Sequence, residues 1–170
     1  MPGNAHLLPR SRELLGSFAA AAEDSDVAPP LALAHDLARN HAEQWSAEDL
    51  CRSPTATDDM VGRVKRRIDL LNGRWVELVD QLDRWVTQNL RQDPTAVRHT
   101  ETYGMLVDRL AIGWVREQKL SAGPESVACA ARDQLAELAA AYDMLVEDVE
   151  EHRRSLPAWR SLKFYRTAAG

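Results

Sequence analysis

The sequence predicts an all-α fold: an up-and-down bundle of four main helices with an additional N-terminal helix and a C-terminal tail packed on the bundle. Apolar residues recur at steps of three and four over long segments, as amphipathic helices require. Glycine, proline and short polar clusters separate these segments, and no alternating run of β-branched residues is long enough for a strand. Long helices joined by short connections pack most economically as a bundle.

The sequence divides at residue 30 into an N-terminal segment and the bundle. Residues 1–29 are expected to form an N-terminal helix or arm, and residues 30–170 the bundle, within one globular domain. The apolar patch Leu14–Ala22 contains small residues and is followed by acidic ones, which indicates a helix rather than a signal peptide. The first bundle helix is predicted from Pro30, which suits a first turn, to about Cys51.

Three further helices follow. The second bundle helix is predicted over Asp58–Leu90, with Thr57 as its N-cap and Trp75 on its core stripe. After a loop, the third is predicted over Thr102–Leu120 and the fourth over Glu125–Arg154. The tail beyond them is expected to cover one end of the bundle.

Composition excludes several classes of function. A net charge of −5 and a pI near 5.5 argue against a nucleic-acid-binding surface, which is normally basic. No apolar run approaches the roughly 20 residues that span a bilayer. Cys51 and Cys129 are far apart and belong to no C-x-x-C pair, so we expect reduced thiols in a cytoplasmic protein.

Polar residues occupy positions where packing alone would favour apolar ones. On the first bundle helix, His41, Trp45 and Glu48 continue the inward stripe that begins at Ala34. On the later helices, three more polar residues lie on or beside the core face: Asp69, Asn72 and Asp108. Buried polar groups cost free energy unless they are paired, so partners or a ligand are expected.

Two glycines in these segments also require an explanation. Gly73 in mid-helix suggests close approach by another backbone or a ligand, because glycine there costs about 1 kcal/mol relative to alanine. Gly104 in the first turn of its helix would leave backbone N–H groups accessible to an anion.

Four ordered motifs carry a family resemblance: "WSAEDLCR", "KRRIDLLNGRW", "ETYGMLVDRLAI" and "LKFYR". Over about Leu31–Arg166 the chain resembles a bacterial family defined only as domain of unknown function 4254. The matching residues are Trp45, Glu48, Asp49, Asp69, Asn72, Arg74, Glu101, Thr102, Gly104, Asp108, Arg109, Lys163 and Tyr165.

The resemblance implies a helical fold and no established activity. Members are often associated with glycosyl-transfer or other biosynthetic gene sets. The family's histidine after the tryptophan is Ser46 here, and its proline after Glu-Thr is Tyr103. His41, one turn before that position, could substitute for the missing histidine.

A purely structural interpretation of the polar residues is a network of buried ion pairs. Glu48 or Asp49 would pair with Arg67 or Arg74, and Asp69 with a neighbouring arginine. Asp108 would pair with Lys163. Such networks fix helix register more than they add stability, since desolvation offsets the attraction.

Metal and cofactor sites are not predicted. The chain has no Glu-x-x-His motif, and His41 and Glu48 would need ligands from another helix to share a metal. It also has no Walker-type phosphate loop, no dinucleotide-binding glycine motif and no nucleophile elbow. We therefore expect no cofactor.

The remaining enzyme hypothesis is cofactor-free acid–base chemistry on a polar or anionic metabolite, as in an isomerase, lyase or cyclase of a biosynthetic pathway. The candidate catalytic residues are Glu48, Asp108, Asp49 and His41. The candidate substrate-binding residues are Trp45, Asp69, Asn72, Arg67, Arg74, Glu101, Arg109, Lys163 and Tyr165. The alternative is a non-catalytic metabolite-binding or accessory protein that partners a biosynthetic enzyme such as a glycosyltransferase. A homodimer is plausible in either case.

Overall fold

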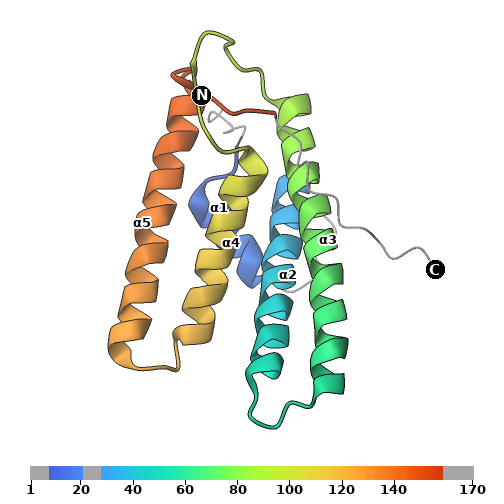
Figure 1. The fold of residues 1–170 in the computed structure, drawn as a ribbon. Helices are drawn as coiled ribbons and strands as arrows, with labels where there is room; N and C mark the ends of the chain where they lie inside the picture. The colour runs from blue at the N-terminus through green and yellow to red at the C-terminus, as the bar shows by residue number, and fades with distance from the viewer. Residues whose placement is uncertain (1–7, 21–27, 159–170) are drawn as a thin grey trace, which may run out of the picture.

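Five helices build the chain in a computed structural model that describes residues 8–20 and 28–158. They are α1 (Ser11–Ala19), α2 (Pro29–Arg52), α3 (Asp58–Asn89), α4 (Tyr103–Leu120) and α5 (Glu125–Glu150). The four long helices run side by side and alternate in direction, with α2 and α3 forming one hairpin and α4 and α5 the other (Figure 1). This confirms the predicted all-α bundle.

The helices begin where the sequence supplies caps. The Thr57 side chain accepts a hydrogen bond from the Met60 N–H at 3.3 Å, and the Thr102 side chain accepts one from the Met105 N–H at 3.4 Å. Each bond satisfies one of the backbone donors that a helix N-terminus leaves free. Pro30 lies in the first turn of α2, where its missing N–H costs nothing.

The N-terminal helix α1 belongs to the bundle core rather than to a separate arm. Leu14 and Phe18 are buried in the same core as the long helices, and α1 packs against α2, α4 and α5. Asp143 of α5 accepts hydrogen bonds from the Ser11 N–H and hydroxyl, both at 2.7 Å. The Tyr142 hydroxyl donates to the Pro9 carbonyl at 2.9 Å, which fixes the segment before α1 as well.

The last helix ends earlier than predicted. α5 stops at Glu150, not Arg154, because His152 adopts a left-handed backbone with φ of 59°. The chain then pairs β2 (Arg154–Ser155) in parallel with β1 (Val97–Arg98), a two-residue strand within the predicted loop. The sequence had predicted no strand, since two residues are too few to show a period.

The two singled-out glycines differ in their surroundings. A Cβ on Gly104 would lie 2.6 Å from the Val79 carbonyl oxygen, so α3 and α4 can approach this closely only because residue 104 is glycine. A Cβ on Gly73 would meet nothing within 4 Å. The expectation of a close backbone approach at Gly73 is therefore wrong.

Two further predictions concern the chain's surroundings and its end. Among the helices of residues 8–20 and 28–158, none is both long and apolar enough to cross a membrane. The predicted packing of the C-terminal tail, with Lys163 and Tyr165, lies outside the described residues.

Candidate functional site

One face of α2 supplies the first side of the site. His41, Gln44, Trp45 and Glu48 are separated by three, one and three residues, which places them on one face over two turns of helix. This face is opposed by α3 and α4, and each of these helices contributes further polar or aromatic side chains. The site thus lies between three helices that are held by the bundle core.

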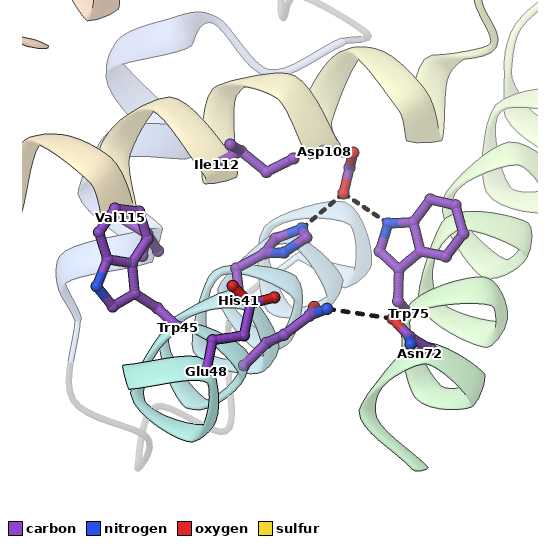
Figure 2. Close-up of a pocket in the computed structure, with 9 residues that line it drawn as sticks. His41, Trp45, Glu48, Asn72, Trp75, Asp108, Ile112 and Val115 are labelled. Carbon is purple, nitrogen blue, oxygen red and sulfur yellow. Dashed lines mark hydrogen bonds and ion pairs between the residues drawn. The ribbon is translucent and has the colours of Figure 1, made fainter. Parts of the chain in front are cut away.

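Asp108 of α4 joins these helices through its carboxylate. Its Oδ1 accepts a hydrogen bond from His41 Nε2 on α2 at 2.6 Å and another from Trp75 Nε1 on α3 at 2.7 Å (Figure 2). The His41 and Asp108 side chains are only 13% and 6% exposed. Hydrogen bonds to a carboxylate are about twice as strong as neutral ones and offset its burial.

This geometry determines which atoms are available for chemistry. A carboxylate only accepts hydrogen bonds, so Nε2 of His41 carries the proton and Nδ1 has a lone pair when the ring is neutral. Within the described part of the chain, neither Nδ1 of His41 nor Oδ2 of Asp108 has a hydrogen-bond partner. The arrangement can therefore accept a proton at Nδ1 while Asp108 holds the ring in place.

A cavity of about 360 Å³ adjoins this arrangement (Figure 2). The lining residues are His41, Gln44, Trp45, Glu48, Asn72, Trp75, Asp108, Ile112 and Val115. The volume is in the range of small-molecule sites, which begins at roughly 300 Å³. Glu48 is 43% exposed, so the cavity reaches solvent beside this carboxylate.

Two pairs of polar side chains border the cavity. Gln44 donates a hydrogen bond from Nε2 to Asn72 Oδ1 at 3.2 Å, which links α2 to α3. At the outer end, Glu48 accepts a hydrogen bond from Arg52 one turn later on α2, at 2.9 Å. Arg52 is 68% exposed, so this pair is screened by solvent and can rearrange at little cost.

Comparison with known proteins places the chain in a family. The family model described as "Protein of unknown function (DUF4254)" matches residues 31–158. The chain belongs to the DUF4254 family. No curated protein and no solved structure matches the chain. Every residue that lines the cavity lies within the DUF4254 match.

The cavity contains part of the set that the sequence predicted. Of the candidate residues, it brings together His41, Trp45, Glu48, Asn72 and Asp108. Four of these also carry the resemblance to DUF4254. His41 lies one turn before Ser46, the position of the DUF4254 histidine, and the structure places it beside the buried aspartate.

The arginines predicted to bind substrate do not line the cavity. Arg67 pairs with Glu43 on the neighbouring helix, and Arg74 lies 3.3 Å from Asp36. The third arginine of the predicted set, Arg109, pairs with Glu101 at 2.8 Å. Neither of these two residues lines the cavity. Each of these arginines is about half exposed. Long cationic side chains keep their charged groups in solvent, and here they pair with nearby surface acids.

The predicted pairings of Glu48 and Asp49 with Arg67 or Arg74 were wrong. Glu48 and Asp49 both pair with Arg52 of their own helix, and Asp49 is exposed outside the cavity. Asp69 is exposed on α3. Asp108 pairs with His41, and its predicted pairing with Lys163 lies outside the described residues, as does Tyr165.

Sequence reasoning missed Gln44 and the role of Trp75. Trp75 was assigned to the core stripe of its helix, and its ring does pack against the core. Its indole N–H nevertheless needs an acceptor when buried, and its position one turn after Asn72 on the same helix was the available signal. Ile112 and Val115 complete the apolar part of the lining.

The predicted anion site at Gly104 is occupied by the protein itself. Asp83 of α3 accepts a hydrogen bond from the Gly104 N–H at 2.6 Å. Burial raises the pKa of the Asp83 carboxyl, although the bonds from Gly104 and Thr102 act in the opposite direction. This carboxylate caps the start of α4 and does not line the cavity.

Metal ligands do not cluster in the described segments. Residues 8–20 and 28–158 contain no group of three or more histidine, cysteine, aspartate or glutamate side chains placed to hold a metal ion. The polar groups that line the cavity are an imidazole, two carboxylates, two amides and two indoles.

Proposed function

We propose that the protein is a small cofactor-independent biosynthetic enzyme of isomerase, lyase or cyclase type that acts on a polar metabolite. The arrangement of His41, Asp108 and Trp75 carries the proposal, because it leaves one imidazole nitrogen available beside a cavity of small-molecule size. The sequence predicted a polar or anionic metabolite. We propose a polar one, because the predicted arginines Arg67, Arg74 and Arg109 do not line the cavity.

His41 acts as the general base in this proposal. Nδ1 takes a proton from the bound metabolite, and Asp108 stabilises the imidazolium through its bond to Nε2–H. The Trp75 indole N–H holds the carboxylate in position for that bond. The same nitrogen returns the proton to another atom of the metabolite, which is the minimal requirement of an isomerase or lyase.

Glu48 supplies a second proton-transfer group at the other end of the cavity. Its carboxylate is solvent-accessible and its bond to Arg52 is easily exchanged, so it can take up or release a proton to water. Trp45, Ile112 and Val115 surround the reacting atoms with apolar surface. Such surface keeps water away from the proton that His41 moves.

The test compares two histidines in cells that lack the gene and carry a plasmid copy. The measured quantity is the amount of end product formed by the biosynthetic pathway that needs the gene, called pathway output below. We expect His41→Asn to reduce it by about 10²–10⁴-fold, the usual contribution of a general base. His152→Asn is the control, because His152 is exposed and its left-handed backbone suits asparagine. A folded His41→Asn protein that restores full output would contradict catalysis.

A second function is favoured by the pairing already present in the cavity. Gln44 bonds Asn72, and Glu48 bonds Arg52, so much of the lining is satisfied without a reacting group. This suits a non-catalytic metabolite-binding or accessory protein that partners a biosynthetic enzyme such as a glycosyltransferase. In that case His41→Asn retains pathway output, whereas filling the cavity by Val115→Trp abolishes it.

Location and assembly complete the proposal. We expect a cytoplasmic protein without nucleic-acid partners, in keeping with its net charge of −5. A homodimer is also proposed, and the observation behind it is two exposed apolar side chains on α5, Val127 at 41% and Met144 at 68%. Light scattering after gel filtration would give the mass of the assembly directly.

A further inference from the structure

We propose that the cavity selects a protonated amine, a small ligand that carries an ammonium group on a hydrocarbon or ring body. The inference rests on the proposed function only in assigning a ligand to the same cavity. In the described part of the chain, its nine lining residues include two carboxylates, Glu48 and Asp108, and no arginine or lysine. Even with His41 protonated, the formal charge of the lining remains negative.

Four cations near the cavity make their contacts outside it. Arg52 bonds Glu48 from the solvent side, and Lys119 donates to the Ser46 hydroxyl at 3.1 Å. Arg67 and Arg74 pair with other acids on the outer surface of α2. Among the described lining residues, an anionic ligand would therefore meet two carboxylates and no guanidinium.

Asp108 gives the ammonium a specific partner. The side chain is 6% exposed, and both of its hydrogen bonds go to the same oxygen, Oδ1. Oδ2 has no hydrogen-bond partner in the described part of the chain, and a carboxylate oxygen on a largely buried side chain gains from a donor. An ammonium N–H in the cavity can supply that donor together with the missing positive charge.

The rest of the lining suits the body of such a ligand. Trp45 offers an indole face, which attracts cations as well as hydrocarbon. Ile112 and Val115 add aliphatic surface from α4. A neutral polyol would use the amides of Gln44 and Asn72, but it would bring no positive charge to a lining that holds two carboxylates and one imidazole.

Three probes of one skeleton separate these ligand classes: benzylamine, benzyl alcohol and benzoate. Binding to the full chain is followed by NMR titration of the indole N–H signals, with the Trp75 signal assigned from Trp75→Phe. We expect saturable shifts with benzylamine at Trp75, and an affinity at least about tenfold above that of either other probe. Equal or tighter binding of benzyl alcohol or benzoate, or no saturable response to benzylamine, would overturn the proposal.

Matched variants locate the charge that is recognised. Glu48→Gln should weaken the binding of benzylamine by about threefold, the scale of a partly exposed ion pair. Glu43→Gln, the control on the same helix, should leave it unchanged, because Glu43 pairs with Arg67 outside the cavity. An equal response to both variants would assign the effect to general charge and refute selection by the cavity.

Failure of this inference is distinguishable from failure of the proposed catalysis. Probe binding is measured without turnover, so His41→Asn can retain the preference for benzylamine while pathway output is lost. If His41→Asn retains output and the preference persists, catalysis fails and amine selection stands. If output is lost while benzoate binds best, the opposite conclusion follows.

Discussion

Two carboxylates contact α4, and their surroundings differ in kind. Asp83 accepts the Gly104 backbone N–H at the first turn of α4, whereas Asp108 lies on α4 itself and accepts from the side chains of His41 and Trp75. A backbone donor cannot change its protonation, but an imidazole can. Asp108 also borders a cavity. Burial alone thus does not distinguish the two carboxylates; the chemistry of their partners and the space beside them do.

The largest expected effect comes from replacing each carboxylate by its amide. Asp108→Asn should reduce pathway output by about 10²–10⁴-fold, because an amide can hold His41 in the wrong tautomer and cannot stabilise the imidazolium. Asp83→Asn should leave output unchanged. Output and circular dichroism would be measured for both. Equal losses of output in folded proteins would remove the distinction between the two regions.

The next effect tests the close packing at the Asp83 end of α4. Gly104→Ala should destabilise the fold by about 1–3 kcal/mol, because its Cβ would overlap the Val79 carbonyl oxygen, which lies 2.6 Å away. Gly73→Ala is the matched control, since its Cβ would meet nothing within 4 Å and helix propensity favours alanine by about 1 kcal/mol. Urea denaturation would measure both; destabilisation by Gly73→Ala would show that Gly73 is needed for packing after all.

A comparable effect on stability is expected from removing one donor at Asp108. Trp75→Phe keeps most of the ring but deletes the indole N–H, which should cost about 1–3 kcal/mol of stability as a lost bond to a buried carboxylate. His41 would then hold Asp108 alone, so output should also fall. Trp85→Phe is the control, because the Trp85 ring also packs against the core, tilted beside Tyr103 with centroids 6.4 Å apart, but does not bond Asp108. Similar changes in both variants would argue that Trp75 acts by packing alone.

The sequence predicted the helices and the inward residues better than their partners. Helix period and threonine caps are local, so α2, α3 and α4 could be placed from spacing, and with them His41 and Asp108. The contact between those two residues spans 67 positions and depends on how three helices pack. Arginine pairs failed for another reason: long exposed side chains reach several acids, and sequence does not rank them.

The smallest expected effect concerns the pH dependence of stability at Asp83. Burial raises the pKa of its carboxyl above the ordinary value of 3.8, so the folded state binds this proton more tightly than the unfolded chain. Stability from this group is therefore present below the unfolded pKa and is lost as pH rises through the folded pKa. Asp83→Asn keeps an acceptor for the Gly104 N–H but removes the titration.

The variant should accordingly gain stability relative to the parent as pH rises from about 3.8 to neutrality, and the difference should then remain constant. We expect it to stay below about 1 kcal/mol, because solvent screens a half-buried group. Urea denaturation at several pH values, with Asp69→Asn as an exposed control, would measure it. A difference that shrinks with rising pH would mean that the bonds from Gly104 and Thr102 outweigh burial, and Asp83 would then be a stabilising cap of α4 in its charged form.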